Sequence, residues 1–285
     1  MKAFPIPVRS IGPGSQPEED AELSFLPLPS SINTFSMPQV PQPADAGATI
    51  RARNFLAGFV RKMGYLDVAL PTVSALTLDA AAEAVLNEVL GEGEVSVRLT
   101  GGRDVRIQET VFAGVWRVRA HDGNGHVVDD TLLAGAIPPL VVDAALEGTA
   151  LSPRALPLPA GAMNSPALLA EIRDQVRRRR NGATAHVINL TLLPLTPDDH
   201  RVLEQALPVG PVAMISRGFG NCRITSTGTR NVWRVQYFNS MQTLILNTIE
   251  VVDVPEVALA APDDLADSRT RLEELIEWMS ESAAA

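Results

Sequence analysis

Hydrophobic residues recur at helical spacing in five stretches of the chain. Residues 49–63 carry such a stripe, and Gly64 directly after them is a helix-ending signal. Further helices are predicted over residues 78–90, from an N-cap at Ser165 to about residue 180, over 197–207, and from Pro262 onward. The last of these has its apolar residues on one face, which are Leu265, Leu272, Leu275, Ile276 and Met279.

Strand-type segments lie between the helices in both halves of the chain. Val95, Val97 and Leu99 alternate with polar neighbours, as expected for a sheet with one wet face. Strands are predicted over residues 95–99, 105–112, 115–120, 186–193, 212–216, 222–227, 232–238 and 243–254. Helices followed by runs of adjacent strands predict an α+β fold with antiparallel sheet.

The second half of the chain repeats the first. GVWRVR at Gly114–Arg119 matches NVWRVQ at Asn231–Gln236, an offset of 117 residues. With that offset, roughly 16 of the 64 positions in residues 78–141 are identical, where about 4 would match by chance. We therefore predict two tandem pseudo-symmetric repeats, residues 49–160 and 161–285, joined by a Pro-containing linker. Both one continuous sheet and two docked domains fit this pattern.

The first 48 residues have a different composition. They hold 9 of the 22 prolines, so a regular helix or a central strand is excluded and an extended N-terminal arm is predicted. A disordered leader and an arm that docks on a partner are the two alternatives. The apolar residues of this stretch favour docking, namely Phe25, Leu26, Leu28, Phe35 and Met37.

Composition narrows the classes of function. The 285-residue chain has a net charge of -9 and a pI of about 5.0, which disfavours binding to nucleic acid or to an anionic membrane surface. The N-terminal MKAFPIPVRS has no apolar core of the kind that a secretory signal needs. We therefore expect a cytoplasmic protein. The run Arg177–Arg180 is interpreted mainly as a solvated helix end, with a partner-binding or nucleic-acid patch as the alternative.

Candidate chemistry is sparse. Cys222 is the one cysteine, so one chain offers no disulfide and no multi-thiolate site, and a buried inert thiol is expected. His121 and His126 flank a turn-like segment, without the further ligands that a metal site requires. No nucleophile motif or phosphate-binding loop is present in the sequence. We expect a protein that is not an enzyme and holds no cofactor or metal.

One long stretch is distinctive as a whole. Its elements are G-x-G-x-C-R-I at Gly218–Ile224, N-V-W-R-V-Q-Y-F-N-S at Asn231–Ser240, L-I-L-N-T-I-E-V at Leu244–Val251 and P-E-V-A-L-A-A-P at Pro255–Pro262. These elements, and GPGSQPEED at Gly12–Asp20, resemble the HupH/HyaF family of hydrogenase expression and maturation proteins. The resemblance implies a non-catalytic accessory protein or chaperone for a nickel–iron hydrogenase. It implies as partners the iron–sulfur small subunit precursor and a thioredoxin-like accessory protein.

The second repeat is expected to be the binding half, because it carries more polar residues of the kind that make specific contacts. The candidate partner-binding residues are Asn231, Trp233, Arg234, Tyr237, Asn239 and Asn247. Trp233 occupies the same repeat position as Trp116, so a core role for it is the alternative. The competing functions are an iron–sulfur or redox carrier, or an enzyme, that uses Cys222 or His186. A homodimer is also compatible with the sequence.

Overall fold

The computed structural model describes residues 46–64, 69–102, 104–218 and 220–282. The Pro-rich arm expected over residues 1–48 lies outside these ranges except for its last three residues. Those three belong to the first helix, which spans Ala46–Met63 where residues 49–63 were predicted.

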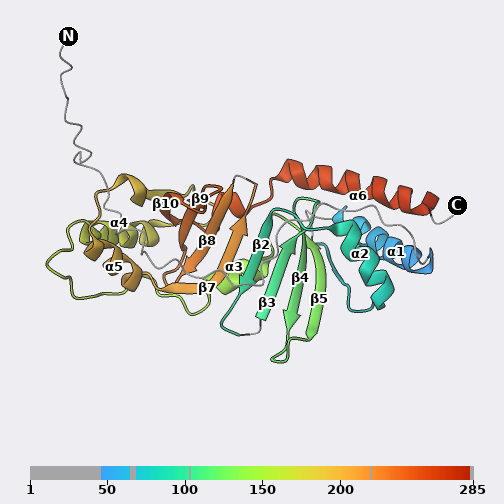
Figure 1. Cartoon of the computed structure of the whole chain (residues 1–285), viewed down its shortest axis with the longest axis horizontal. Helices are drawn as coiled ribbons and strands as arrows, with labels where there is room; N and C mark the ends of the chain where they lie inside the picture. The colour runs from blue at the N-terminus through green and yellow to red at the C-terminus, as the bar shows by residue number, and fades with distance from the viewer. Residues whose placement is uncertain (1–45, 65–68, 103, 219, 283–285) are drawn as a thin grey trace, which may run out of the picture. The chain divides into compact units, whose positions relative to one another are not determined.

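Six α-helices and ten strands make up the described residues (Figure 1). The helices are α1 (Ala46–Met63), α2 (Ala80–Leu90), α3 (Pro139–Leu146), α4 (Ser165–Arg178), α5 (Pro197–Ala206) and α6 (Pro262–Ser282), with short 3-10 turns η2 (Leu190–Leu192) and η3 (Glu256–Ala258). The strands are β1 (Thr72–Ser74), β2 (Val95–Leu99), β3 (Asp104–Glu109), β4 (Val115–His121), β5 (Val127–Ala134), β6 (His186–Asn189), β7 (Val209–Ser216), β8 (Asn221–Thr227), β9 (Val232–Phe238) and β10 (Leu244–Val251). The predicted α+β class is confirmed.

All ten strands belong to one antiparallel sheet, in the order β1-β5-β4-β3-β2-β7-β8-β9-β10-β6. The two halves of the chain meet at the β2–β7 pair, where Val97 lies opposite Met214. These two residues are themselves 117 positions apart, and β4 and β9 begin and end 117 residues apart. Of the two arrangements that fit the sequence, one continuous sheet or two docked domains, the structure has the continuous sheet.

Side chains alternate between the two faces of the sheet and enter separate cores. Trp116 points into a core that α3 and η3 cover, whereas its neighbour Val115 points into a core with α1, α2 and α6. In the same way Trp233 enters the α3 side, and Val232 enters a third core with α4 and α5. Two groups of helices, one with α1, α2 and α6 and one with α4 and α5, therefore cover the outer strands on one face of the sheet. Helix α3 covers the central strands on the other face.

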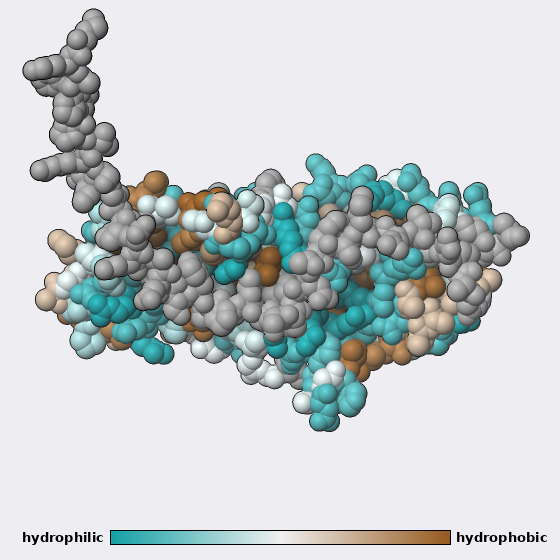
Figure 2. Space-filling model, viewed as in Figure 1, coloured by the Kyte–Doolittle hydropathy of each residue, from teal (hydrophilic) through white to brown (hydrophobic). Residues whose placement is uncertain are grey.

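Helix α6 crosses from the second half of the chain to the first. Leu265, Leu272 and Met279 are buried and pack in the same core as α1 and α2. Leu275 and Ile276 pack on this core while partly buried, so the predicted apolar face of the helix is the one that docks. Hydrophilic side chains cover the outer side of α6 in Figure 2. No helix within the described ranges is long and apolar enough to cross a bilayer.

Three elements and several local expectations differ from the sequence analysis. Strands β1 and β5 and helix α3 were not predicted, and β10 ends at Val251 rather than at residue 254. The N-cap of α4 is Asn164, since Ser165 already lies inside the helix and is buried. Arg179 is not a solvated helix end. Its side chain is 7% exposed, and it pairs with Asp253 at 3.2 Å.

Candidate functional site

The six candidate residues of the second repeat do not form one cluster. Trp233 and Tyr237 point to the α3 side of the sheet, because they occupy alternate positions of β9. Arg234 points to the opposite face, as does Asn247, which lies opposite Gln236 in β10. Asn231 and Asn239 flank β9 at its two ends. The sheet therefore divides the candidates between two faces and two turns.

Trp233 is a core residue, not a surface contact. Its side chain is 1% exposed, and its indole N–H donates to the carbonyls of Val252 at 3.1 Å and Asp253 at 3.2 Å. Trp116 at the matching position is 0% exposed and donates to the Gly135 carbonyl. The expectation of a partner contact at Trp233 is therefore corrected, because a fully buried ring has no surface to offer.

The two flanking asparagines have roles within the chain. Asn231 adopts a left-handed backbone conformation with φ of 58°, and its Nδ2 donates to Asp253 at 2.9 Å. Asn239 accepts hydrogen bonds from the backbone N–H groups of Met241 and Thr243, both at 2.9 Å. These are the turn functions for which asparagine is favoured. Hydrogen bonds within the chain therefore account for both asparagine side chains, without a partner protein.

Tyr237 lines a pocket of about 790 Å³ beside β10 and the segment that follows it. Glu250 lines the same pocket, and burial raises the pKa of its carboxyl. Arg179 and Asp253 form a charged wall, while Val187 on the edge strand β6 is 52% exposed. The pocket is therefore a mixed apolar and charged hollow at one edge of the sheet.

Cys222 lies opposite Tyr237 on the neighbouring strand β8 and is 0% exposed. Burial raises the pKa of its thiol to about 12, although a hydrogen bond with Tyr237 acts in the opposite direction. Burial likewise raises the pKa of Tyr237 to about 12. A thiol held protonated and away from solvent is a poor nucleophile and a poor metal ligand. Within the described residues, no group of three or more potential ligands is positioned for a metal ion.

The histidines are also separate from one another. His121 lies 3.4 Å from the backbone carbonyl of Asp104, and the exposed His126 pairs with Asp122 in the same turn. His186 pairs with Glu171 at 2.7 Å on the surface. None of these three rings is hydrogen-bonded to the Cys222 thiol in the part of the chain described, as a nucleophile–base pair would be.

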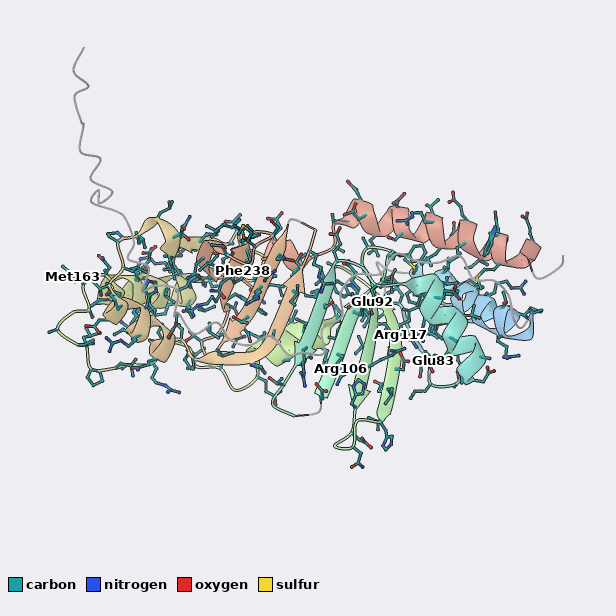
Figure 3. The ribbon with its side chains drawn as sticks, in the orientation of Figure 1. Glu83, Glu92, Arg106, Arg117, Met163 and Phe238 are labelled. Atoms are coloured by element: carbon teal, nitrogen blue, oxygen red, sulfur yellow. The ribbon has the colours of Figure 1, made fainter. Side chains whose placement is uncertain are left out.

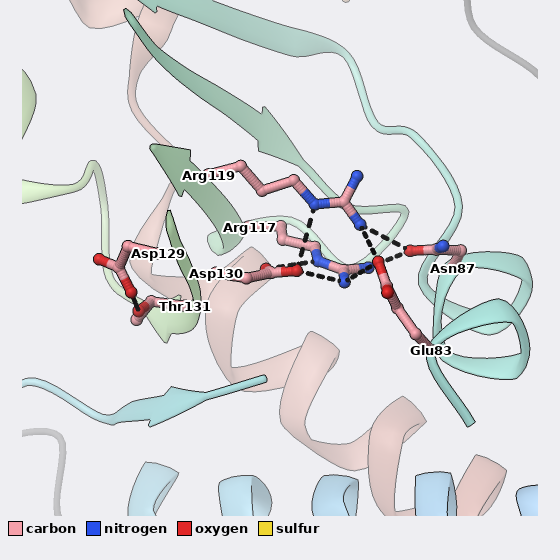
Figure 4. Close-up of polar contacts among 7 residues, drawn as sticks. All are labelled: Glu83, Asn87, Arg117, Arg119, Asp129, Asp130 and Thr131. Carbon is pink, nitrogen blue, oxygen red and sulfur yellow. Dashed lines mark hydrogen bonds and ion pairs between the residues drawn. The ribbon is translucent and has the colours of Figure 1, made fainter. Parts of the chain in front are cut away.

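A polar cluster that the sequence analysis missed lies on the opposite face of the sheet, in the first half (Figure 4). Arg117 of β4 binds Asp130 of β5 with two hydrogen bonds, from Nε at 2.8 Å and from Nη2 at 2.7 Å. Asn87 and Glu83 of α2 complete its shell, and Figure 3 shows Arg117 and Glu83 side by side. Arg119 pairs with the same two carboxylates.

The central ion pair of this first-half cluster is buried and hydrogen-bonded within the chain. The side chains of Arg117 and Asp130 are 8% and 6% exposed. Burial alone would raise the pKa of Asp130, but the hydrogen bonds and charges of Arg117 and Arg119 outweigh it and hold that pKa below its usual value. The contacts of Arg117 with Glu83 and Asn87 join α2 to the sheet.

The matching positions of the second half carry a different set of residues. Arg234 replaces Arg117, Asn247 replaces Asp130 and Glu204 replaces Asn87, each 117 positions later. Among the described residues, Arg234 donates no hydrogen bond, and its one charged neighbour is Glu204 at 3.8 Å. Arg234 and Asn247 were predicted as candidates, whereas Glu204 was not. The 117-residue offset is the signal that could have found it.

Comparison with known proteins finds similarity over nearly the whole chain. The model of the HupH hydrogenase expression protein, C-terminal conserved region, matches residues 72–156 and 162–279. The hydrogenase expression/formation protein HoxQ of Cupriavidus necator is 42% identical over 282 residues, covering 98% of this chain and 99% of that protein.

Two further relatives have similar coverage. The hydrogenase expression/formation protein HupH of Rhodobacter capsulatus is 42% identical over 276 residues, which are 96% of this chain and 98% of the relative. The hydrogenase-1 operon protein HyaF of Escherichia coli K12 is 34% identical over 278 residues, 96% of each chain. A solved structure of the hydrogenase expression protein HupH from Thiobacillus denitrificans is 29% identical, with a TM-score of 0.38. It matches 40% of this chain and 95% of its own.

Proposed function

Because the chain belongs to the HupH family of hydrogenase expression proteins, we propose that it is a non-catalytic accessory protein in the maturation of a nickel–iron hydrogenase. The observation that carries this proposal is similarity over nearly the whole chain to proteins named for hydrogenase expression or formation. The location that this role requires is the cytoplasm, where the hydrogenase subunits are made.

We further propose that it binds the iron–sulfur small subunit precursor as a chaperone during assembly, alongside a thioredoxin-like accessory protein. Support comes from the candidate residues that remain at the surface or in a pocket, since the proposal needs a contact region. Tyr237 lines the pocket beside β10, and Arg234 keeps 19% of its side chain exposed on the other face. Arginine and tyrosine are common anchors of protein interfaces.

A duplicated architecture is part of the proposal. We infer that the two halves, residues 49–160 and 161–285, are two copies of one α+β unit that share a sheet. The matching strand bounds and the Val97–Met214 pairing support this inference. In such a molecule one copy can keep internal polar contacts while the other loses them, and the second copy is the one with unsatisfied polar groups.

The test is anaerobic affinity purification from cells that make the hydrogenase. A tagged chain is expected to co-elute with the small subunit precursor, in roughly equal amounts and without bound iron. The large subunit precursor serves as the comparison in the same preparation. Elution of the chain alone would contradict the chaperone role, and elution with iron would favour a cluster carrier.

One variant tests both alternatives that use Cys222, the carrier and the enzyme, against the chaperone role. Cys222→Ala removes the thiol but keeps the small buried side chain, so the protein is expected to fold and to support full hydrogenase maturation. Hydrogenase activity in cells that carry this variant is the measurement. A loss of maturation in a folded variant would return the thiol to the mechanism.

A further inference from the structure

One arginine in each half of the sheet occupies the same position but has different partners. Arg117 is bound by the carboxylate of Asp130 through two hydrogen bonds, a geometry that stabilises a buried guanidinium. Asn247 takes the place of Asp130 beside Arg234. Asparagine has nearly the shape of aspartate but no charge, so the second arginine lacks the carboxylate that the first one binds.

The surroundings of Arg234 do not compensate for this loss. Glu204 approaches to 3.8 Å, which is longer than a hydrogen bond, and its own side chain is 44% exposed. Burial lowers the pKa of Arg234, and the charge of Glu204 opposes this effect only in part. Asn247 is 9% exposed, and its Oδ1 has no hydrogen-bond partner. Buried polar groups are normally satisfied, so Asn247 is an exception, while the half-buried Arg234 has only the long contact to Glu204.

The second-half position is also more accessible. The side chain of Arg234 is 19% exposed, whereas that of Arg117 is 8% exposed. Gln236, which lies opposite Asn247 on the same face, replaces Arg119 of the first half. Arg223 lies opposite Gln236 on β8 and adds a second positive charge to this row across the sheet. The face thus presents two arginines from the sheet in a chain whose net charge is -9.

We propose that Arg234 and Asn247 form a binding site for an acidic side chain of a partner protein, whose carboxylate takes the place that Asp130 occupies beside Arg117. Arg234 donates to both carboxylate oxygens, and the Asn247 amide turns its NH2 group toward the same oxygens. Glu204 is displaced toward solvent when the carboxylate binds. The inference rests on the proposed function only for the identity of the partner, the small subunit precursor.

The first test restores the internal ion pair. Asn247→Asp gives Arg234 the carboxylate that Arg117 has, so the variant is expected to unfold at an equal or higher urea concentration than the wild type. Its affinity for the small subunit precursor is expected to fall by about tenfold or more, because the site is then occupied from within. A binding loss without a stability loss separates this outcome from misfolding. Undiminished affinity in the folded variant would overturn the proposal.

The matched controls change one charge each. Asp130→Asn makes the reverse exchange in the first half, where it is expected to lower stability and to leave partner affinity unchanged. Glu204→Gln removes the competing carboxylate beside Arg234, so partner affinity is expected to rise severalfold. A rise with Asp130→Asn, or a fall with Glu204→Gln, would contradict the assignment of the site to Arg234.

A second readout does not need the hydrogenase subunit. Two peptides, acetyl-Gly-Asp-Gly-amide and acetyl-Gly-Asn-Gly-amide, are titrated into the full chain while the Nε–Hε resonance of Arg234 is followed by NMR. The aspartate peptide is expected to shift this resonance in the wild type and not in Asn247→Asp. The asparagine peptide is expected to leave it in place in both proteins. Equal shifts with both peptides, or no shift with either, would overturn the carboxylate site. A shift with the acidic peptide in a chain that captures no small subunit would instead refute the proposed function alone.

Discussion

At the scale of single residues, Asp199 holds two segments of the second half together. Its carboxylate accepts hydrogen bonds from the backbone N–H groups of Asn164, Ser165 and Thr196, at 2.9, 2.8 and 3.0 Å. The side chain is fully buried at the start of α5. Burial alone would raise its pKa, but these donors outweigh that effect and hold the pKa well below the usual range.

A pH dependence follows from this depressed pKa. The folded state binds its proton less readily than the unfolded chain, so Asp199 stabilises the fold fully above about pH 5, and the stabilisation is lost as the pH falls toward the folded pKa. Asp199→Asn is expected to cost about 2 kcal/mol of unfolding free energy at pH 7. Urea unfolding at a series of pH values is the measurement. A difference from the wild type that stays constant down to pH 3 would contradict this role.

Asn231 illustrates a residue whose conformation matters as much as its contacts. Its φ of 58° matches the 74° of Gly114 at the same repeat position, so both halves need a left-handed residue before the tryptophan strand. Asn231→Ala loses the hydrogen bond to Asp253 and adds backbone strain, whereas Asn231→Gly loses only the hydrogen bond. The alanine variant is expected to be less stable than the glycine variant by about 1 kcal/mol. Thermal unfolding of both distinguishes them, and equal stabilities would refute the strain argument.

At the scale of elements, the hydrophobic pattern of the sequence predicts those strands whose residues alternate regularly between buried and polar positions. Strand β9 has the predicted bounds because Val232, Trp233, Arg234 and Val235 alternate between faces and the same pattern recurs in β4. Strand β5 was missed because Asp129 and Asp130 interrupt its apolar run. Asp130 is buried there only because Arg117 on the next strand pairs with it, and no local pattern contains that contact.

The candidate site shows the same limit. Comparison of the two halves identified Asn247 as a polar residue that differs between them, and Arg234 was a candidate because arginine is a common interface anchor. It did not reveal that Trp233 is enclosed by the segment after β10, or that Glu204 from α5 approaches Arg234. Both facts depend on which helix packs on which strand, and that choice is made by contacts distant in the sequence.

Helix α6 provides a test at this scale, because it belongs to the second half of the chain and covers the core of the first. Leu272 is 0% exposed in that core. Leu272→Ala is expected to lower the unfolding free energy by about 3 kcal/mol through lost burial and the cavity left behind. Arg269→Ala, one turn away at an exposed ion pair with Glu273, is the control and is expected to change it by less than about 0.5 kcal/mol. Similar losses in both variants would mean that α6 is not docked by its apolar face.

At the scale of the whole described structure, the two halves share too much surface to be independent. Strands β2 and β7 pair over five residues, and one core contains Val97 and Trp116 together with Met214 and Trp233. The crossing of α6 adds a second connection. The described residues accordingly fall in one compact unit, with no division near residue 160.

Cooperative unfolding should follow from this arrangement. Trp116 and Trp233 report on the two halves separately, once the other tryptophans, including Trp278, are replaced by phenylalanine. In each single-tryptophan variant, the urea midpoint from fluorescence is expected to coincide with the midpoint from circular dichroism of the same variant. Comparing the two signals within one variant removes the effect of the substitutions on stability. If the fluorescence of one half changed before the circular dichroism, that half would unfold alone, and the shared sheet would join two domains of separate stability instead of forming one folding unit.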